Sequence, residues 1–203
     1  VCAVTPGTWK VHGTERMHRR PIGPLVKALL ALGADVEYLE QEGFLPLLIK
    51  GNDNLPGKEV SILAAISSQY ISALLMIAAK LPGGLKLELK GNAVSLDYIE
   101  LTRQLLLNFG VKSKWVGNQI TIPRQAMKDA TFITGADWSA ASYFYAYVAL
   151  SKQPVFLGGL TQNSAQGDKV CSQIFKYVGV ETEEDEKGCR LTYREPKFPP
   201  RPF

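Results

Sequence analysis

One arrangement recurs three times along this chain of 203 residues: an amphipathic helix pattern ends at a glycine and is followed by two short β-type runs. The three segments read PIGPLVKALLALGADVEYLE, YIELTRQLLLNFGVKSKWV and KVCSQIFKYVGVETEED. Their glycines, Gly33, Gly110 and Gly179, recur at intervals of about 70 residues, a spacing typical of an internal repeat. The pattern therefore restricts the chain to repeated modules that each combine helices with a small sheet.

A glycine directly after an amphipathic run favours the left-handed backbone conformation that ends a helix. We therefore expect each of the three helices to stop at its glycine. After the second stop, Gly117-Asn118 separates two short runs of alternating polar and apolar residues. This pattern predicts a two-residue hairpin turn.

Further elements precede the second and third segments. VSILA and LKLELKG flank a helix predicted over residues 67–81, and ATFITG and PVFLGG flank a helix predicted over 138–150. The repeat unit is then β-α-β-α-β-β, which places two helices against one side of a four-stranded sheet. The expected fold class is α/β, in the wider sense that includes α+β.

About two and a half such units fit this chain. We expect residues 1–160 to form part of a first domain and residues 161–203 to begin a second, with a crossover near residues 158–166. The chain begins in mid-unit at Val1, and its last residues, PKFPPRPF, are too rich in proline to close a sheet. We therefore expect the 203 residues to be an internal fragment of a longer chain.

Composition excludes several classes of protein. With 46% hydrophobic and 21% charged residues, the chain is typical of a soluble globular protein, and its apolar runs are shorter than the roughly 20 residues that a membrane span needs. The first residues lack the pattern of a signal peptide. Three scattered cysteines argue against a disulfide framework or a zinc site and favour a reducing compartment, with the cytoplasm as the default location. The net charge of +4 does not require a nucleic-acid partner, but the cluster of Arg16, His18, Arg19 and Arg20 suggests an anionic ligand.

The helix predicted over residues 67–81 begins with three polar residues, Ser67, Ser68 and Gln69, although a helix needs only one cap. A helix start carries free backbone N–H groups and the positive end of the helix dipole, so added donors could converge on an anion such as phosphate. The alternative is an ordinary cap by Ser67 or Ser68, with Gln69 facing water. Both interpretations fit the residues alone.

Other predicted helix starts are polar as well. Ser95 precedes a helix that has Tyr98 three residues on, so both hydroxyls can project from one helix mouth. Arg20 precedes Pro21, which suits a first helical position, so an anion would offset the repulsion between the arginine and the helix dipole; a solvated Arg20 is the alternative. Two later starts are surrounded by Asp137, Ser139 and Ser142 and by Asn163, Ser164 and Gln166. If the helices run parallel, we expect these starts to converge on one broad anion-binding surface.

At these residues the sequence resembles the enolpyruvyl transferase family. The matching segments, in the expected order over roughly residues 13–180, are ERMHRRPIG, LGADVEYLEQEGFLPLLIKG, SSQYISALLMIAA, GNAVSLDYIELT, ADWSAASYF and NSAQGD. They favour the branch that acts on shikimate 3-phosphate over the branch that acts on a UDP-sugar. The tryptophan of ADWSAASY, where many relatives have a small residue, resembles a bacterial subgroup.

The resemblance implies a two-domain, inside-out fold of six β-α-β-α-β-β units with the active site between the domains, so residues 1–160 would belong to a substrate-binding domain. The implied reaction transfers the enolpyruvyl group of phosphoenolpyruvate to the 5-hydroxyl of shikimate 3-phosphate through a tetrahedral ketal intermediate and releases phosphate. This is a step of the shikimate pathway of aromatic amino-acid biosynthesis. The implied partners are the two substrates, without nucleic acid, membrane, metal or organic cofactor, and the full-length protein would be a monomer.

The resemblance also implies roles for individual residues. Ser67, Ser68 and Ser95 would hold the phosphate of shikimate 3-phosphate, and Gln69 would reach both this substrate and phosphoenolpyruvate. Arg20 would bind phosphoenolpyruvate through a charge-assisted contact, and Tyr98 would line the shikimate site.

The catalytic groups of the family have no counterpart in this chain. The family's N-terminal lysine and arginine and the aspartate, glutamate and lysines of its other domain lie outside it. The available candidates, Asp97, Asp137, Asp168, His12 and His18, do not occupy the family's catalytic positions. We therefore expect no catalytic residue within the 203 residues, and no turnover by this chain alone.

A non-catalytic module that binds phosphate or nucleic acid is the alternative from another functional class. Against it, the aromatic residues Tyr143, Phe144, Tyr145 and Tyr147 follow the pattern of a buried helix better than that of an exposed stacking platform.

Overall fold

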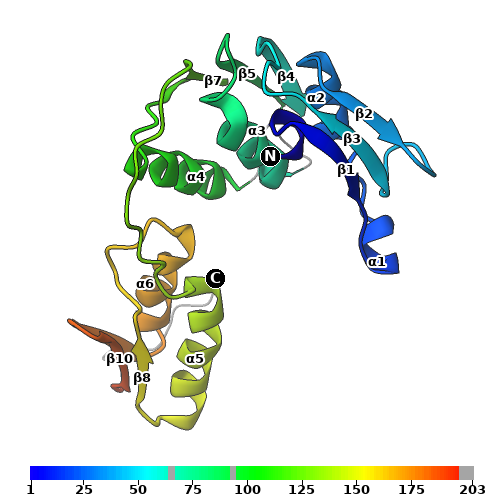
Figure 1. Ribbon diagram of the computed structural model, residues 1–203. Helices are drawn as coiled ribbons and strands as arrows, with labels where there is room; N and C mark the ends of the chain where they lie inside the picture. The colour runs from blue at the N-terminus through cyan, green and yellow to red at the C-terminus, as the bar shows by residue number, and fades with distance from the viewer. Residues whose placement is uncertain (64–66, 92–94, 197–203) are drawn as a thin grey trace. The chain divides into compact units, whose positions relative to one another are not determined.

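The computed structural model describes residues 1–63, 67–91 and 95–196. The chain folds into two compact units, residues 1–130 and 131–203 (Figure 1). Each unit has its own hydrophobic core, and each is described here by itself.

The first unit contains one complete β-α-β-α-β-β repeat. Its elements in chain order are β4 (Glu59–Leu63), α3 (Ser68–Ala78), β5 (Leu85–Lys90), α4 (Leu96–Asn108), β6 (Lys114–Val116) and β7 (Gln119–Ile122). The four strands form one sheet in the order β4-β5-β7-β6, in which β4 and β5 are parallel and the other pairs antiparallel. The repeat predicted from the sequence is confirmed for this segment, including the two-residue turn at Gly117-Asn118.

A second, smaller sheet completes the first unit. Its segment contains η1 (Cys2–Val4), β1 (Gly7–Val11), α1 (Glu15–His18), α2 (Gly23–Ala31), β2 (Asp35–Tyr38) and β3 (Leu47–Gly51). The strands pair in the order β1-β3-β2, all antiparallel. Helix α2 contacts β4 of the larger sheet, so both sheets share one core.

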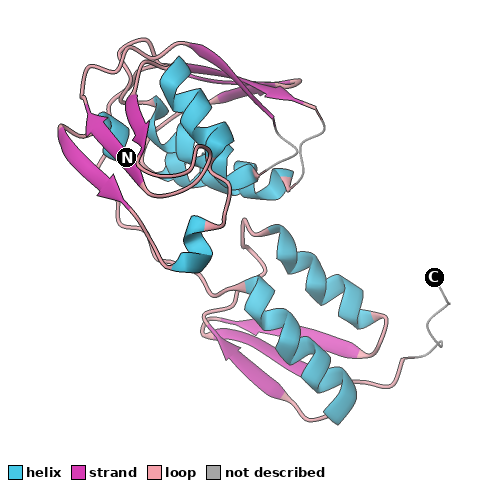
Figure 2. Cartoon of the chain, turned by 90° about the vertical axis from the view of Figure 1, so that its right-hand side faces the viewer, coloured by secondary structure: helices cyan, strands magenta, loops and turns pink. Residues whose placement is uncertain are grey.

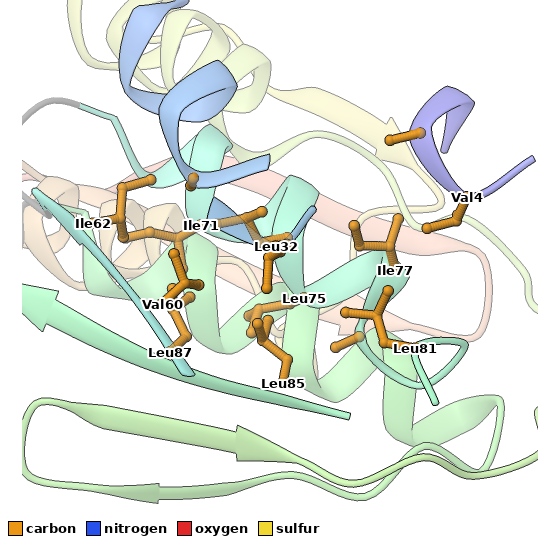
Figure 3. Packing of buried hydrophobic residues seen from close by; sticks show 14 of the residues in the cluster. Val4, Leu32, Val60, Ile62, Ile71, Leu75, Ile77, Leu81, Leu85 and Leu87 are labelled. Carbon is orange, nitrogen blue, oxygen red and sulfur yellow. The ribbon is translucent and has the colours of Figure 1, made fainter. Parts of the chain in front are cut away.

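The core of the first unit is centred on α3. This helix buries Ile71, Leu74, Leu75 and Ala78, which recur at the spacing of one helix face. Figure 3 shows Ile71 and Leu75 next to side chains of the sheet such as Val60 and Leu87. Full burial of such aliphatic side chains stabilises the fold by about 1.5–3 kcal/mol each. This packing fixes the position of α3, and therefore of its first turn.

The second unit contains α5 (Trp138–Ser151), β8 (Val155–Gly158), η2 (Gly167–Val170), α6 (Cys171–Lys176), β9 (Val180–Asp185) and β10 (Gly188–Tyr193). The strands form an antiparallel sheet in the order β8-β10-β9. Both helices pack on one face of this sheet (Figure 2). Its core is formed mainly by Trp138, Tyr145, Val180 and Leu191, all fully buried.

The same strand order occurs in all three sheets. In β1-β3-β2, β5-β7-β6 and β8-β10-β9, the strand before the helix pairs with the last strand of the module rather than with the next one. The glycines that end the intervening helices, Gly33, Gly110 and Gly179, have φ angles of 94°, 80° and 90°. The predicted left-handed helix stops are therefore confirmed, and with them the internal repeat.

The structure corrects the expected boundary near residue 160, because it divides the chain after Ala130. A break at 160 would separate β8 from its partner β10 and α5 from α6. The segment 158–166, predicted to be a crossover, lies within the second unit, where Leu160 is part of the hydrophobic core.

The strand predicted over residues 130–135 does not form. Residues 126–135 are all exposed, including the apolar Phe132 and Ile133, and the second unit has a three-stranded sheet in place of the expected four. The β-type composition of ATFITG favoured a strand, but a strand also needs a paired neighbour and a buried face.

The prediction of a buried aromatic helix was wrong for most of its residues. Tyr145 is fully buried, whereas Tyr143, Phe144 and Tyr147 are exposed to 79%, 46% and 52%. Consecutive residues on a helix point in different directions, so one sheet can cover only part of this aromatic run.

Among the described residues, the helices are all too short or too polar to cross a membrane.

The helix-stop glycines offer a matched test of backbone strain and packing. Gly33→Ala is expected to lower the free energy of unfolding by about 1–2 kcal/mol, which is the cost of the left-handed conformation for a residue with a Cβ. The new Cβ itself would make only ordinary van der Waals contacts, the nearest at 3.5 Å to Pro56 Cδ. Gly179→Ala is expected to cost clearly more, since its Cβ would lie 2.4 Å from the Arg194 carbonyl oxygen. Hydrogen exchange resolved by peptide measures the free energy of unfolding of each unit separately. Equal losses of stability in the two variants would contradict the steric argument.

Candidate functional site

The first turn of α3 combines a cap with additional donors. Ser67 is the N-cap residue, and its Oγ accepts a hydrogen bond of 3.3 Å from the Gln69 backbone N–H. The ordinary-cap interpretation therefore describes Ser67 in this structure. A hydroxyl that accepts a capping bond can still donate its own hydrogen, so Ser67 can cap the helix and donate to a ligand at the same time. Ser68 is buried at 9% exposure, and Gln69 is exposed.

The first turn of α4 is built differently. Ser95 is its N-cap residue and has a left-handed backbone, with φ 57° and ψ 49°, and its side chain makes no capping bond. Such a conformation costs a non-glycine residue on the order of 1 kcal/mol or more. Ser95, Asp97 and Tyr98 are exposed. Within the part of the chain that the structure describes, the hydroxyl of Ser95 makes no hydrogen bond, and it lies at a helix start with free backbone N–H groups.

The two helix starts open at the same edge of the sheet. Helix α3 follows β4, α4 follows β5, and these two strands are parallel, so both helices begin beyond the carboxyl ends of neighbouring strands. One turn into each helix, Ser72 Oγ lies 2.7 Å from Thr102 Oγ1. Thr102 donates its own hydrogen to the Tyr98 carbonyl oxygen at 2.9 Å, so Ser72 is the donor to Thr102. The structure thus brings the starts that carry Ser67, Ser68, Gln69, Ser95 and Tyr98 side by side.

Arg20 belongs to the loop before α2, and the structure corrects the predicted role of Pro21. Helix α2 begins at Gly23, with Pro24 in its first turn, so Pro21 lies outside the helix. The loop is fixed from two sides. Ile22 and Gly23 donate backbone N–H bonds to the Gly43 carbonyl oxygen, and the hydroxyl of Tyr70, in the first turn of α3, donates to the Pro21 carbonyl oxygen. The peptide that follows Arg20 is therefore bonded both to the first turn of α3 and to the turn between β2 and β3.

Arg20 differs from the neighbouring cation. Arg19 forms an i,i+4 ion pair with Glu15, whereas Arg20 is exposed and takes part in none of the ion pairs among the described residues. Arg20 stands on a loop that is bonded to the first turn of α3, so its guanidinium adds positive charge to the part of the first unit that contains the positive dipole end of this helix. The loop and the two helix starts together form a candidate anion site within the first unit.

The polar residues of the second unit are satisfied by one another. Asp137 caps α5 by accepting from the N–H groups of Ser139 and Ala140, and Ser139 donates its hydroxyl hydrogen to Asp168. The Gln166 amide accepts from the Trp138 N–H and donates to the Ala136 carbonyl oxygen, each at 2.8 Å. Two carboxylates stand beside this start, whereas the first turn of α4 has one, Asp97, and that of α3 has none, so an anion is least favoured at α5.

A groove of about 420 Å³ lies beside this cluster, lined by Ser139, Ser142, Tyr143, Asp168, Val170, Cys171, Ile174 and Phe175. Burial, with a smaller contribution from the Asp168 carboxylate, raises the pKa of the Cys171 thiol, and burial likewise raises the pKa of Cys189. Burial also raises the pKa of Tyr145 to about 12, opposed by its hydrogen bond with Thr182. These groups are therefore protonated at neutral pH and unsuited to act as nucleophiles. Among residues 1–63, 67–91 and 95–196, His, Cys, Asp and Glu side chains form no group of three that could hold a metal ion.

Comparison with known proteins relates nearly the whole chain to one family. A sequence profile described as EPSP synthase (3-phosphoshikimate 1-carboxyvinyltransferase) matches residues 1–199. The 3-phosphoshikimate 1-carboxyvinyltransferase of Bacteroides fragilis is 48% identical over 189 residues, which make up 92% of this chain and 46% of that protein. The enzyme of the same name from Cellvibrio japonicus is 40% identical over 181 residues, 88% of this chain and 42% of that protein. The chain thus spans about half the length of the curated relatives it matches.

Solved structures agree on the fold. The structure of EPSP synthase from Acinetobacter baumannii matches 96% of this chain and 44% of its own, with a TM-score of 0.72 and 18% identity. The expected fold class, an α/β architecture of the enolpyruvyl transferase type, is therefore confirmed.

Sequence reasoning missed the residues that hold the site together. Tyr70, Ser72 and Thr102 make the hydrogen bonds between the loop, α3 and α4. In the sequence they belong to two ordinary amphipathic helix patterns and to no recognisable motif. Their helical spacing could have identified two of them. Ser72 lies four residues after Ser68, and Thr102 four after Tyr98, so each stands one helical turn after a candidate substrate-binding residue.

The hydroxyl pair between α3 and α4 can be tested without changing side-chain volume. Thr102→Val is expected to lower the free energy of unfolding by about 1–2 kcal/mol, because it removes both the bond from Ser72 and the bond to the Tyr98 carbonyl oxygen. It should also shift the backbone amide signals of both first turns in NMR spectra. Thr102→Ser keeps the hydroxyl and is the control. Urea denaturation of the three proteins checks this; a valine variant with native stability and unchanged first-turn signals would contradict the proposed link.

Proposed function

Because the chain belongs to the EPSP synthase family, we propose that the full-length protein transfers the enolpyruvyl group of phosphoenolpyruvate to the 5-hydroxyl of shikimate 3-phosphate, releasing phosphate. The protein is then an alkyl-group transferase of the shikimate pathway, which leads to aromatic amino acids. The observation that carries this proposal is the pair of helix starts, α3 and α4, at one edge of the sheet, with the Arg20 loop bonded to α3.

The phosphate of shikimate 3-phosphate binds between the two helix starts. Ser67, Ser68 and Ser95 donate their hydroxyl hydrogens to its oxygens, and the free N–H groups of the first turns add weaker donors and the positive dipole ends. The left-handed backbone of Ser95 supports this role, since strain of this kind persists where the surrounding structure and a ligand compensate for it. Tyr98, exposed on the first turn of α4, lines the ring of the same substrate.

Phosphoenolpyruvate binds beside the first substrate. Arg20 contributes a charge-assisted hydrogen bond to its carboxylate or phosphate, and the Gln69 amide can donate to one substrate while its carbonyl accepts from the other. The two substrates therefore meet at the start of α3. Holding the 5-hydroxyl next to the enol carbon converts a bimolecular encounter into a reaction within one complex.

The reaction has two steps, an addition and an elimination, and both include proton transfers. The 5-hydroxyl oxygen adds to C2 of phosphoenolpyruvate and loses its proton while the methylene carbon C3 gains one, which gives the tetrahedral ketal; loss of phosphate and of a C3 proton then restores the double bond. Positioned acids and bases typically accelerate each transfer by about 10²–10⁴-fold. We assign no residue of this chain to these transfers, so its contribution is to bind and orient the substrates.

We further propose that the full-length protein is a monomer in the bacterial cytoplasm, with the two substrates as its only partners and no metal or organic cofactor. The three free cysteines support a reducing compartment.

A comparison with Arg19 separates the specific role of Arg20 from the general effect of removing a positive charge. In the full-length protein, Arg20→Ala is expected to lower kcat/KM for phosphoenolpyruvate by about 10–150-fold, the value of a hydrogen bond to a charged group. Arg19→Ala, which removes a cation paired with Glu15, is the matched control and should change kcat/KM less than about 2-fold, as expected of an exposed ion pair. Steady-state kinetics gives both values; equal losses at the two positions would refute the specific role.

The chain of 203 residues should by itself bind phosphate weakly and form no enolpyruvyl product. Gln69, Ser95 and Tyr98 are exposed, so a bound phosphate stays partly in water, where solvent screens the helix-start charges. In NMR titration with inorganic phosphate at millimolar concentrations, amide signals near residues 67–69 and Ser95 should shift. Those of Ser139 and Ala140, capped by Asp137, should not.

Mass spectrometry of a mixture with both substrates checks the second part. Turnover by the verified 203-residue chain, abolished by a substitution within it, would show that the acid and base groups had been misplaced. Equal shifts at the starts of α3 and α5 would contradict the assignment of the anion site to the first unit.

A further inference from the structure

Tyr70 makes the contact that attaches the Arg20 loop to α3. Its ring is half-buried and packs against the hydrophobic core of the first unit, while its hydroxyl donates to the Pro21 carbonyl oxygen. The contact joins residues 49 positions apart in the sequence. Tyr70 directly follows Gln69 at the start of α3, and Pro21 directly follows Arg20. The hydrogen bond therefore joins the backbone next to Arg20 to the residue next to Gln69, and these are the two residues proposed to bind phosphoenolpyruvate.

The other bonds of the loop do not provide this connection. The N–H groups of Ile22 and Gly23 donate to Gly43, at 2.8 and 3.1 Å, and so attach the loop to the turn between β2 and β3. Among the described residues, the bond donated by the Tyr70 hydroxyl is the one hydrogen bond that joins α3 to residues 20–23. Without it, α2 would remain in place while the peptide that follows Arg20 could move away from the start of α3.

Tyr70 also belongs to a longer series of contacts. Two residues further along α3, Ser72 donates to Thr102, which donates to the Tyr98 carbonyl oxygen of α4. Helix α3 is thus bonded on one side to the Arg20 loop and on the other to the first turn of α4. Arg20 depends on Tyr70 for its position, whereas Tyr98 and Ser95 depend on the hydroxyl pair.

We propose that Tyr70 is a positioning residue for phosphoenolpyruvate: its hydroxyl fixes the Pro21 carbonyl so that the Arg20 guanidinium and the Gln69 amide address the same substrate. This inference rests on the proposed function and extends it to a residue that touches neither substrate. The side chain that would touch phosphoenolpyruvate is Arg20, and Tyr70 acts through it.

Kinetics of the full-length protein tests this directly, because Tyr70→Phe removes one oxygen and keeps the packed ring. The variant should raise KM for phosphoenolpyruvate by about 3- to 10-fold, the effect of one lost hydrogen bond. The kcat and the KM for shikimate 3-phosphate should stay within about 2-fold, since the bonds to α4 are intact and the cation is misplaced rather than removed. The melting temperature of each variant shows that it is folded.

A double-mutant cycle separates positioning from a general structural effect. If Tyr70 acts through Arg20, Tyr70→Phe should have almost no effect on KM for phosphoenolpyruvate in the Arg20→Ala background, so the two substitutions are strongly non-additive. Thr102→Val is the matched control from the other side of α3: it should raise KM for shikimate 3-phosphate more than KM for phosphoenolpyruvate.

The outcomes distinguish the inference from the function beneath it. Unchanged KM for phosphoenolpyruvate in Tyr70→Phe, or an equal effect with and without Arg20, would overturn the positioning role while the transferase activity stands. Absence of enolpyruvyl product from the unmodified full-length protein would overturn both.

Discussion

The parallel pairing of β4 with β5 is the constraint on which the candidate site depends. Antiparallel neighbours would send the following helices to opposite edges of the sheet, whereas parallel neighbours start both helices at the same edge. The buried face of α3 then fixes its rotation, because Ile71, Leu74 and Leu75 must face the core. With the rotation fixed, Ser72 faces α4 and bonds Thr102, which holds the first turns of the two helices next to each other. The site therefore follows from sheet topology first and from its own polar residues second.

Much of the local structure could be predicted from the sequence because it depends on neighbours in the chain. Gly33, Gly110 and Gly179 adopt the left-handed conformation that a helix stop requires, and Gly117-Asn118 forms the hairpin turn. Ser67 caps its helix as a serine at that position should. These features need only the chemistry of a few consecutive residues, and the repeat made them easier to recognise since each occurs in an equivalent place.

Features that depend on distant partners were not predictable in this way. ATFITG has the composition of a strand, but residues 130–135 are exposed and unpaired in the described structure, and the boundary between units falls just before them. The order Arg20-Pro21 resembles a helix start, but the hydrogen bonds to Gly43 move the start of α2 to Gly23. The partnership of Tyr70 with Pro21 spans two elements of the first unit, and nothing in either local sequence specifies it.

The common strand order of the three sheets has a consequence for biosynthesis. In each of β1-β3-β2, β5-β7-β6 and β8-β10-β9, the central strand is the last of the three to leave the ribosome. Until it emerges, the two outer strands have no partner in that trio, and the helix between them has no completed sheet to cover. Each trio can therefore close only when its final strand has been synthesised.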